Sequence, residues 1–286
     1  GPGPADLRAP GAVSCYACQW VTPHRARNAP CATYPGADMQ LNTQKPEKRV
    51  ESDGRELSVH SIFHTIQGEG PFCGTPAVFV RLAGCNLQCP QCDTNYTTGR
   101  KMMKTHEILR EVLNLTEGLN KTRLVVITGG EPFRQELSNL FDLLFCTEFF
   151  VQVESNGTLA PPEEPENTDL DHWFYNHNAW ERNGVYIVCS PKAGKVHPKI
   201  HQHCCAYKYV GGRHNLSKED GLPLRPLEHP SAKGVPRPKG DKDIYLQPTD
   251  EQDETRNAFN LKACVESCLK HGYILQLQIH KLIGVA

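Results

Sequence analysis

The sequence predicts an α/β protein built as a partial, modified TIM-like (β/α) barrel. From Ser58 onward, strand patterns alternate with helix patterns, which is typical of parallel strands joined by right-handed crossovers. Polar or glycine-rich clusters follow one strand after another, as they do around the active-site rim of barrel enzymes. The chain has 286 residues and too few strand patterns for eight repeats. We therefore expect an incomplete barrel.

The expected strands are short apolar runs, and the expected helices have apolar residues on one face. Ile108, Val112 and Leu115 recur at helical spacing, and Thr105 precedes them as a candidate N-cap. The run at 124–127 is typical of a buried strand. Strands are expected at 58–63, 77–82, 124–127, 149–153, 185–189, 207–210, 244–246 and 274–279, and helices at 105–115, 135–145 and 254–270.

The clusters that end these strands predict an active site. Any single cluster could be ordinary turn chemistry. Because the carboxyl ends of parallel strands lie on one rim, several such clusters in succession favour a shared site there. The clusters are residues 128–132, 154–158, 190–192, 211–212, 247–250 and 280–281.

Composition divides the chain into two parts. Residues 1–56 are rich in Gly, Pro, Ala and Arg and lack apolar periodicity, so we expect a disordered leader, native or added for expression. Its Cys15 and Cys18 resemble half of a zinc site without a clear second half, so incidental thiols are favoured. The catalytic domain is expected at 57–286, with an acidic and aromatic insertion near 161–183 and a Pro- and Lys-rich one near 217–242.

Charge and hydropathy argue against a nucleic-acid-binding or membrane-bound protein. The chain carries 31 basic and 32 acidic residues, a net charge of −1, so we expect no nucleic-acid partner. We also expect no membrane partner, because apolar runs are too short to span a bilayer, and the first residues lack a secretory pattern. The 13 cysteines include several expected in the core, namely Cys146, Cys189, Cys264 and Cys268, while His201, His203, Cys204 and Cys205 are interpreted as incidental neighbours.

Three cysteines organise the chain. Cys85, Cys89 and Cys92 have C-x3-C-x2-C spacing in a segment without helical or strand periodicity. Iron–sulfur clusters are held by cysteine thiolates, usually four per cubane, so three thiolates leave one iron open to S-adenosylmethionine (SAM). A zinc site would require a fourth ligand, and no other Cys or His is nearby in sequence. Cys73 is not expected to be a fourth ligand of the iron–sulfur cluster, because a cluster closed by four thiolates could not bind SAM. In this spacing the chain resembles the radical SAM superfamily.

Across residues 57–286 the chain resembles the 7-carboxy-7-deazaguanine synthase family. The T-G-G-E-P segment at 128–132 marks only the superfamily, whereas Q-G-E-G at 67–70, C-D-T at 92–94 and the terminal H-K at 280–281 are more specific together. The resemblance also covers 65–70, 79–87, 154–158, 190–192, 247–248 and 280–286.

The resemblance implies a partial barrel of the radical SAM type and a carbon–nitrogen lyase of queuosine and 7-deazapurine biosynthesis, a tRNA modification pathway. Members contract 6-carboxy-5,6,7,8-tetrahydropterin to 7-carboxy-7-deazaguanine and release ammonia. The implied cofactors are a 4Fe–4S cluster, SAM and Mg²⁺. The implied partners are the pterin substrate, a flavodoxin- or ferredoxin-type electron donor and a second copy of the chain. Because the thiolates need a reducing compartment, we expect a cytoplasmic protein.

The resemblance also implies roles for individual residues. Cys85, Cys89 and Cys92 would hold the cluster, and Thr94 the Mg²⁺. SAM contacts are expected from Gln91, Gly130, Glu131, Glu154, Ser155, Asn156, Ser190, Pro191, Lys192, Gln247, Pro248, Thr249 and Asp250. Substrate contacts are expected from Ile66, Gln67, Gly68, Glu69, Arg81, Thr128, His280 and Ala286, the last through its terminal carboxylate.

The residue chemistry fits these roles, and each has a plainer alternative. A guanidinium such as that of Arg81 forms bidentate pairs with a carboxylate, although a surface ion pair is the plainer interpretation. The backbone of 66–68 could bind the pterin edge or form a simple turn. A lone His280 is more often structural.

Two other functions remain open from sequence. Another radical SAM enzyme, such as a glycyl-radical activating enzyme, would act on a protein and need not carry the Q-G-E-G or terminal H-K segments. A zinc-binding protein without enzymatic activity is the other alternative.

Overall fold

The computed structural model describes residues 42–92, 94–119, 121–163, 184–192, 194–225, 227 and 234–285. Ala286, the leader cysteines and residues 164–183 of the first predicted insertion lie outside these described residues. So do positions 226 and 228–233 of the second insertion.

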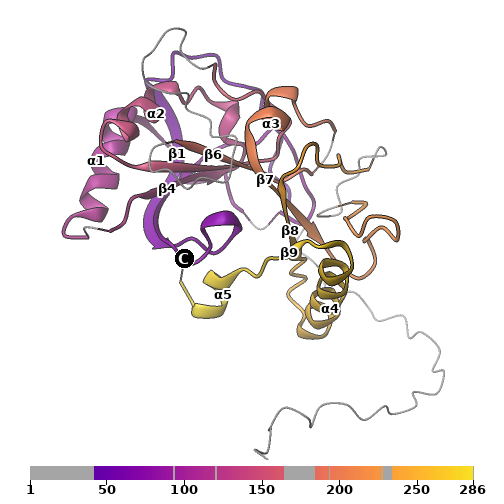
Figure 1. The fold of residues 1–286 in the computed structure, drawn as a ribbon. Helices are drawn as coiled ribbons and strands as arrows, with labels where there is room; N and C mark the ends of the chain where they lie inside the picture. Colours follow the sequence, from indigo (N-terminus) through magenta and orange to yellow (C-terminus); the bar gives the residue numbers. More distant parts are fainter. Residues whose placement is uncertain are drawn as a thin grey trace, which may run out of the picture. The chain divides into compact units, whose positions relative to one another are not determined.

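Within the described residues, nine strands form one sheet in the order β3-β1-β2-β4-β5-β6-β7-β8-β9. Figure 1 shows β8 and β9 next to the last long helix, residues 254–271. Neighbouring strands from β2 to β9 are parallel, whereas β1 is antiparallel to both β2 and β3. The sheet has two edges, as an incomplete barrel requires, and the α/β class is confirmed. The strands are β1 (Glu56–Ile66), β2 (Pro76–Leu82), β3 (Lys101–Lys104), β4 (Leu124–Gly129), β5 (Phe150–Ser155), β6 (Val185–Cys189), β7 (Cys204–Gly211), β8 (Asp243–Pro248) and β9 (Ile274–Leu275).

The helices are α1 (Thr105–Thr116), α2 (Ser138–Phe145), α3 (Pro198–His203), α4 (Glu254–His271) and α5 (Ile279–Ile283), with short 3-10 turns η1 (Gly70–Phe72) and η2 (Pro132–Arg134). The predicted N-cap of α1 was wrong by one residue, because Thr105 is the first helical residue and Lys104 precedes it as N-cap. The carboxylate of Glu107 accepts the backbone N–H of Lys104 at 2.8 Å, so this end of the helix needs no hydroxyl cap.

Helix α2 begins at Ser138, three residues later than predicted, because Gln135 is used elsewhere. Its side chain accepts the backbone N–H of Ser58 at 2.6 Å and donates to the Ser58 carbonyl at 3.0 Å. Gln135 therefore continues the hydrogen bonding of strand β1 instead of starting the helix.

The end of the chain differs most from expectation. The strand predicted at 274–279 stops after Leu275, and residues 279–283 form α5. Strand β9 is the sheet edge, so the residues after Leu275 have no further strand beyond them to pair with. Leu282 and Ile283 of α5 are 72% and 56% exposed.

The apolar core lies between the parallel strands and helices α1, α2 and α4. All residues of β6 are buried, as are the first four of β4. Cys189, Cys264 and Cys268 belong to this core, as predicted. Cys146 was wrongly placed there: it follows the last residue of α2, where it is exposed.

Residues 42–55, which were expected to belong to the leader, contact the cysteine loop and η2. The backbone N–H of Glu47 donates to the Cys85 carbonyl at 2.7 Å, and that of Val50 donates to the Arg134 carbonyl at 2.8 Å. The folded part of the chain therefore includes residues well before 57.

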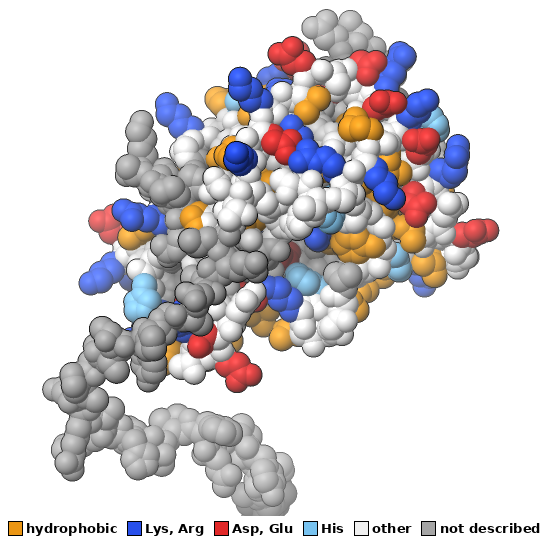
Figure 2. All heavy atoms as spheres, turned by 180° about the vertical axis from the view of Figure 1, so that it is seen from behind, with side chains coloured by type: hydrophobic (Ala, Val, Ile, Leu, Met, Phe, Trp, Pro, Cys, Tyr) orange, Lys and Arg blue, Asp and Glu red, His pale blue; other side chains and the backbone are white. Residues whose placement is uncertain are grey.

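The surface carries charges of both signs. On the face drawn in Figure 2, basic and acidic side chains are interspersed. Within the described part of the chain, no helix combines the length and the apolar character that a membrane crossing requires.

Candidate active site

A cavity of about 470 Å³ lies at the carboxyl ends of the parallel strands. Strands β1, β2, β4, β5, β7 and β8 contribute residues to its wall, as do the segments after β6, β8 and β9, which explains why the polar clusters follow the strands. The predicted site residues that line it are Ile66, Gln67, Glu69, Arg81, Cys85, Cys89, Gln91, Cys92, Thr94, Thr128, Gly130, Glu154, Ser155, Asn156, Ser190, Lys192, Gln247, Asp250 and His280. The predicted residues Gly68, Glu131, Pro191, Pro248 and Thr249 are not part of its lining. Gly211 and Gly212 are not either, and strand β7 contributes Lys208 and Val210 instead.

The three thiols of the cysteine loop lie on one side of this cavity. Cys85 and Cys89 are 9% and 7% exposed, and Cys92 is more open. Burial raises the pKa of the Cys85 thiol to about 12 and that of Cys89 to about 11. Binding of a cluster as thiolates would therefore release protons from this loop.

The arrangement of the three cysteines is compatible with an iron–sulfur cluster. Among the described residues, no three His, Cys, Asp or Glu side chains are arranged to hold one metal ion. A cubane distributes its thiolates over separate irons, so its ligands need not converge on one point. The backbone N–H of Leu87 donates to the Cys85 sulfur at 3.4 Å, and Asn156 Nδ2 lies 4.0 Å from that sulfur. Such donors tune iron–sulfur clusters in proteins.

The glycine pair after β4 brings the cysteine loop against the sheet. A Cβ on Gly130 would overlap the carbonyl of Gly84, and one on Gly129 would overlap that of Leu82. The close approach allows the N–H of Glu131 to donate to the Gly84 carbonyl at 3.0 Å. The T-G-G-E-P segment thus fixes the start of the cysteine loop, in addition to lining the cavity through Gly130.

Glu131, for which the resemblance implies a SAM contact, lies outside the cavity lining. It is fully buried, and its carboxylate accepts bonds from the N–H of Phe133 (3.1 Å), the hydroxyl of Ser155 (2.8 Å) and the N–H of Asn156 (2.7 Å). Burial raises the pKa of Glu131 to about 7 against the effect of these donors. Glu131 connects the ends of β4 and β5, because its carboxylate fixes Ser155 and Asn156 by hydrogen bonds.

On the side occupied by Glu69, the cavity has a buried charge network that sequence reasoning missed. Lys208 of β7 forms an ion pair with Glu69, and its Nζ lies 3.6 Å from the carboxylate of Glu154. Gln67 donates to Glu154 at 3.1 Å, and Gln278 donates to Glu69 at 2.7 Å. Although burial opposes it, the positive charge and hydrogen bond of Lys208 hold the pKa of Glu69 down to about 2. The one signal in the sequence was a lysine inside an apolar strand, between two tyrosines.

Arg81 combines a positive charge with aromatic neighbours. Its guanidinium lies over the ring of Phe63, 5.4 Å from the ring centroid, and Phe63 stacks on Phe79. The buried Nε of Arg81 has no hydrogen-bond partner within the described residues. An unpaired donor beside two rings that line the cavity suits a flat, anionic ligand.

The segments that carried the most specific resemblance meet in space. The N–H of Gly70 donates to the Gln276 side chain at 2.7 Å, and that side chain donates to the Gly68 carbonyl at 3.1 Å. A Cβ on Gly68 would overlap the ring of His280. The Q-G-E-G turn and the terminal H-K segment thus form one wall, although Gly68 contributes through its backbone position and not through the lining.

Several residues expected to bind SAM form hydrogen bonds with neighbours in the cavity wall or in the cysteine loop. Lys192 donates to the Ser190 hydroxyl at 2.5 Å, and the Asn156 side chain donates to that of Asn86 at 2.9 Å. The carboxylate of Asp250 pairs with Lys281 at 2.7 Å, and this hydrogen bond lowers the pKa of Asp250 to about 2.

The cavity, the thiol loop and the parallel sheet define the class: an α/β enzyme whose site is built to hold an iron–sulfur cofactor. Residues 66–152 match the family model described as a 4Fe-4S single cluster domain. The 7-carboxy-7-deazaguanine synthase of Rhodospirillum rubrum is 35% identical over 240 residues, which cover 82% of this chain and 94% of that protein. The synthase of Rickettsia prowazekii is 36% identical over 251 residues, covering 84% and 94%.

The chain therefore belongs to the 7-carboxy-7-deazaguanine synthase family, and the resemblance drawn from the sequence is confirmed. The fold is similar to that in the crystal structure of QueE from Escherichia coli, with a TM-score of 0.53 and 23% identity, over 78% of this chain and 93% of that one.

Proposed function

We propose that this chain is a 7-carboxy-7-deazaguanine synthase, a radical SAM carbon–nitrogen lyase. It would convert 6-carboxy-5,6,7,8-tetrahydropterin into 7-carboxy-7-deazaguanine and ammonia, in the queuosine and 7-deazapurine pathway that leads to modified tRNA. One observation carries the proposal: the cysteine loop, the Q-G-E-G turn and the terminal H-K segment all contribute to a single cavity in a member of this family.

Cys85, Cys89 and Cys92 would hold a 4Fe–4S cluster, and SAM would bind beside it. When bound, this pair supplies the radical that starts the ring contraction. The neighbouring residues Ser190, Lys192 and Asn156 would orient SAM, and Glu131 would hold Ser155 and Asn156 in place from below. Thr94, beside Cys92 in the cavity lining, is the proposed Mg²⁺ ligand, with water and substrate completing the coordination.

The substrate would occupy the part of the cavity between Arg81 and Lys208. Arg81 would bind the pterin carboxylate, and Phe63 and Phe79 would bound the flat ring system. Glu69, kept ionised beside Lys208, and the carboxylate oxygens of Glu154 offer acceptors to the amino and ring N–H groups of the pterin. His280 and Gln278 lie beside this part of the cavity and would contact the same ligand.

The remaining partners are part of the same proposal. A flavodoxin- or ferredoxin-type protein would deliver the electron, the chain would act as a homodimer, and the thiolates require a reducing cytoplasm.

Anaerobic reconstitution with iron and sulfide tests this function. With carboxytetrahydropterin, SAM and dithionite, we expect 7-carboxy-7-deazaguanine to form without net loss of SAM. Release of deoxyadenosine without pterin turnover would instead favour a radical SAM enzyme that acts on another substrate. A protein that binds zinc in place of iron and sulfide would refute the enzyme assignment.

A further inference from the structure

The segment that precedes the first strand holds the cysteine loop from outside the cavity. Residues 42–50, called the clasp below, contain no helix or strand and do not line the cavity. Three clasp donors bind backbone carbonyls of the cysteine loop: Asn42 N to Pro90 (2.9 Å), Asn42 Nδ2 to Cys89 (3.1 Å) and Glu47 N to Cys85 (2.7 Å). Two of the three cysteines are thus bound through their own peptide groups.

Asn42 and Gln44 connect the two arms of the cysteine loop. Gln44 donates to the Thr94 carbonyl at 2.9 Å and accepts the N–H of Tyr96 at 2.7 Å. The buried Tyr96 hydroxyl donates to the Leu87 carbonyl at 3.2 Å and lies 3.3 Å from Asn42 Nδ2. The clasp therefore holds the residues before Cys89 and those after Cys92 in one hydrogen-bonded network.

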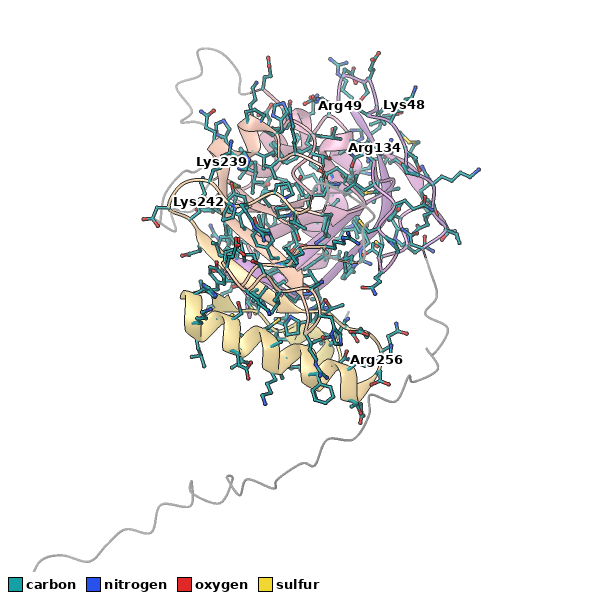
Figure 3. All side chains as sticks on the ribbon, turned by 90° about the vertical axis from the view of Figure 1, so that its right-hand side faces the viewer. Lys48, Arg49, Arg134, Lys239, Lys242 and Arg256 are labelled. Atoms are coloured by element: carbon teal, nitrogen blue, oxygen red, sulfur yellow. The ribbon has the colours of Figure 1, made fainter. Side chains whose placement is uncertain are left out.

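A buried arginine anchors the other end of the clasp. Arg134 of η2 pairs with the Glu47 carboxylate at 3.2 Å and donates to the Lys48 carbonyl at 2.8 Å. The same guanidinium donates to the Ala83 carbonyl at 3.2 Å and lies against Gly84, directly before Cys85. In Figure 3, Lys48, Arg49 and Arg134 lie together on one side of the molecule.

These contacts matter because the cysteine loop lacks regular structure. Backbone carbonyls in such a loop need partners, and a loop without them moves its side chains and admits water. Solvent exposure and ligand order both affect the stability and reduction potential of an iron–sulfur cluster.

We propose that the clasp is a positioning element for the iron–sulfur cluster, in which Asn42 and Gln44 fix the ligand loop and limit the access of water to it. This inference rests on the proposed cluster at Cys85, Cys89 and Cys92. One-electron reduction adds negative charge to a site that already carries three thiolates. A clasp that limits water access disfavours the reduced form, so loosening the clasp shifts the reduction potential to more positive values.

The test compares Asn42→Ala, Gln44→Ala and the double variant with Thr43→Ala, a control at the exposed residue between them. Each full-length chain is reconstituted anaerobically. Three properties are measured: the rate of iron release to a chelator, the midpoint potential of the cluster by electron paramagnetic resonance without SAM, and the far-ultraviolet circular dichroism spectrum. We expect unchanged circular dichroism and a positive shift in potential for the double variant, with iron release about 10- to 100-fold faster than in the control, the usual effect of removing groups that support metal ligands.

Equal release rates and equal potentials in the double variant and the Thr43→Ala control would overturn the inference and leave the proposed function intact. A wild-type chain that binds no cluster, or a Cys89→Ala variant that keeps one, would overturn the cluster assignment and the role of the clasp together. Loss of fold in the double variant leaves the single variants to decide by the same two measurements.

Discussion

Replacing Lys208 by methionine tests the buried charge network directly. The substitution keeps an unbranched side chain of similar size and removes its charge, so the Glu69 carboxylate remains buried without its cation. In the wild type the pKa of Glu69 is lowered from 4.5 to about 2. At roughly 1.4 kcal/mol per pKa unit, this shift corresponds to about 3 kcal/mol of stability at neutral pH. Removing one partner of a buried ion pair typically costs about 3–5 kcal/mol.

The lowered pKa of Glu69 determines how the stability lost in Lys208→Met should change with pH. A carboxyl with a lowered pKa contributes its stability above the unfolded value of 4.5, and this contribution is lost as the pH falls toward 2. Without Lys208, the effect of burial dominates and raises the pKa of Glu69. As the pH falls, the Glu69 carboxylate of the variant therefore becomes protonated, and the cost of burying its negative charge disappears. The loss of stability in Lys208→Met should therefore be largest near pH 7 and smaller near pH 5.

Urea unfolding of the anaerobic protein at both pH values measures the effect. The matched control is Lys199→Met, which removes an exposed lysine that pairs with the exposed Glu163 and should cost less than about 1 kcal/mol. In the double variant Lys208→Met/Glu69→Gln, most of the lost stability should return, because neither charge is then buried alone. A Lys208→Met variant within 1 kcal/mol of the wild type at pH 7, or a double variant without recovery, would refute this account of the network.

Four further predictions concern the rest of the site. Cys89→Ala should remove the brown colour of the reconstituted protein, and a variant that keeps its iron and activity would contradict the ligand assignment. Arg81→Met should raise the KM for carboxytetrahydropterin about 10- to 100-fold, since hydrogen bonds to charged groups contribute about 1.5–3 kcal/mol, whereas the exposed Arg123→Met serves as a neutral control. Because the pKa of Glu131 is raised to about 7, the wild type should lose stability relative to Glu131→Gln as the pH rises from about 4.5 to about 7. Urea unfolding of both proteins measures this difference in stability, and a difference that does not change with pH would contradict the raised pKa. Gly130→Ala should lower the iron content per chain by displacing the Gly84 carbonyl, and full iron loading would show that the close approach is dispensable.

The sequence predicted the sheet and most of the cavity lining because both follow from local pattern. Short apolar runs such as 124–127 and 185–189 are strands, and the polar residues after them meet because parallel strands share one carboxyl edge. The cysteine loop was evident from its spacing alone. Position after a strand does not fix the direction of a side chain: the carboxylate of Glu131 accepts bonds from Ser155 and Asn156 instead of lining the cavity.

The features that were missed depend on tertiary contacts. Lys208 alternates with Tyr207 and Tyr209, as an exposed residue of a strand would, and only the pairing of β7 inside the sheet brings it to Glu69. No pattern in the sequence marks Asn42 and Gln44, because they bind backbone carbonyls of the cysteine loop, which lies about 50 residues away and has no regular structure. The alternating apolar residues of 274–279 resemble a strand in sequence, but strand pairing stops after Leu275 because β9 is the edge of the sheet.

The wall formed by the Q-G-E-G turn and the terminal segment has a consequence for how the protein matures in the cell. Gly70 and Gln276 are 206 positions apart, so during synthesis the early turn emerges long before the glutamine that holds it. Contacts of such separation form late, after the intervening strands have assembled. A cluster delivered before Gln276 is in place would meet a cysteine loop beside an unfinished cavity, so we expect cofactor insertion to follow the assembly of this wall.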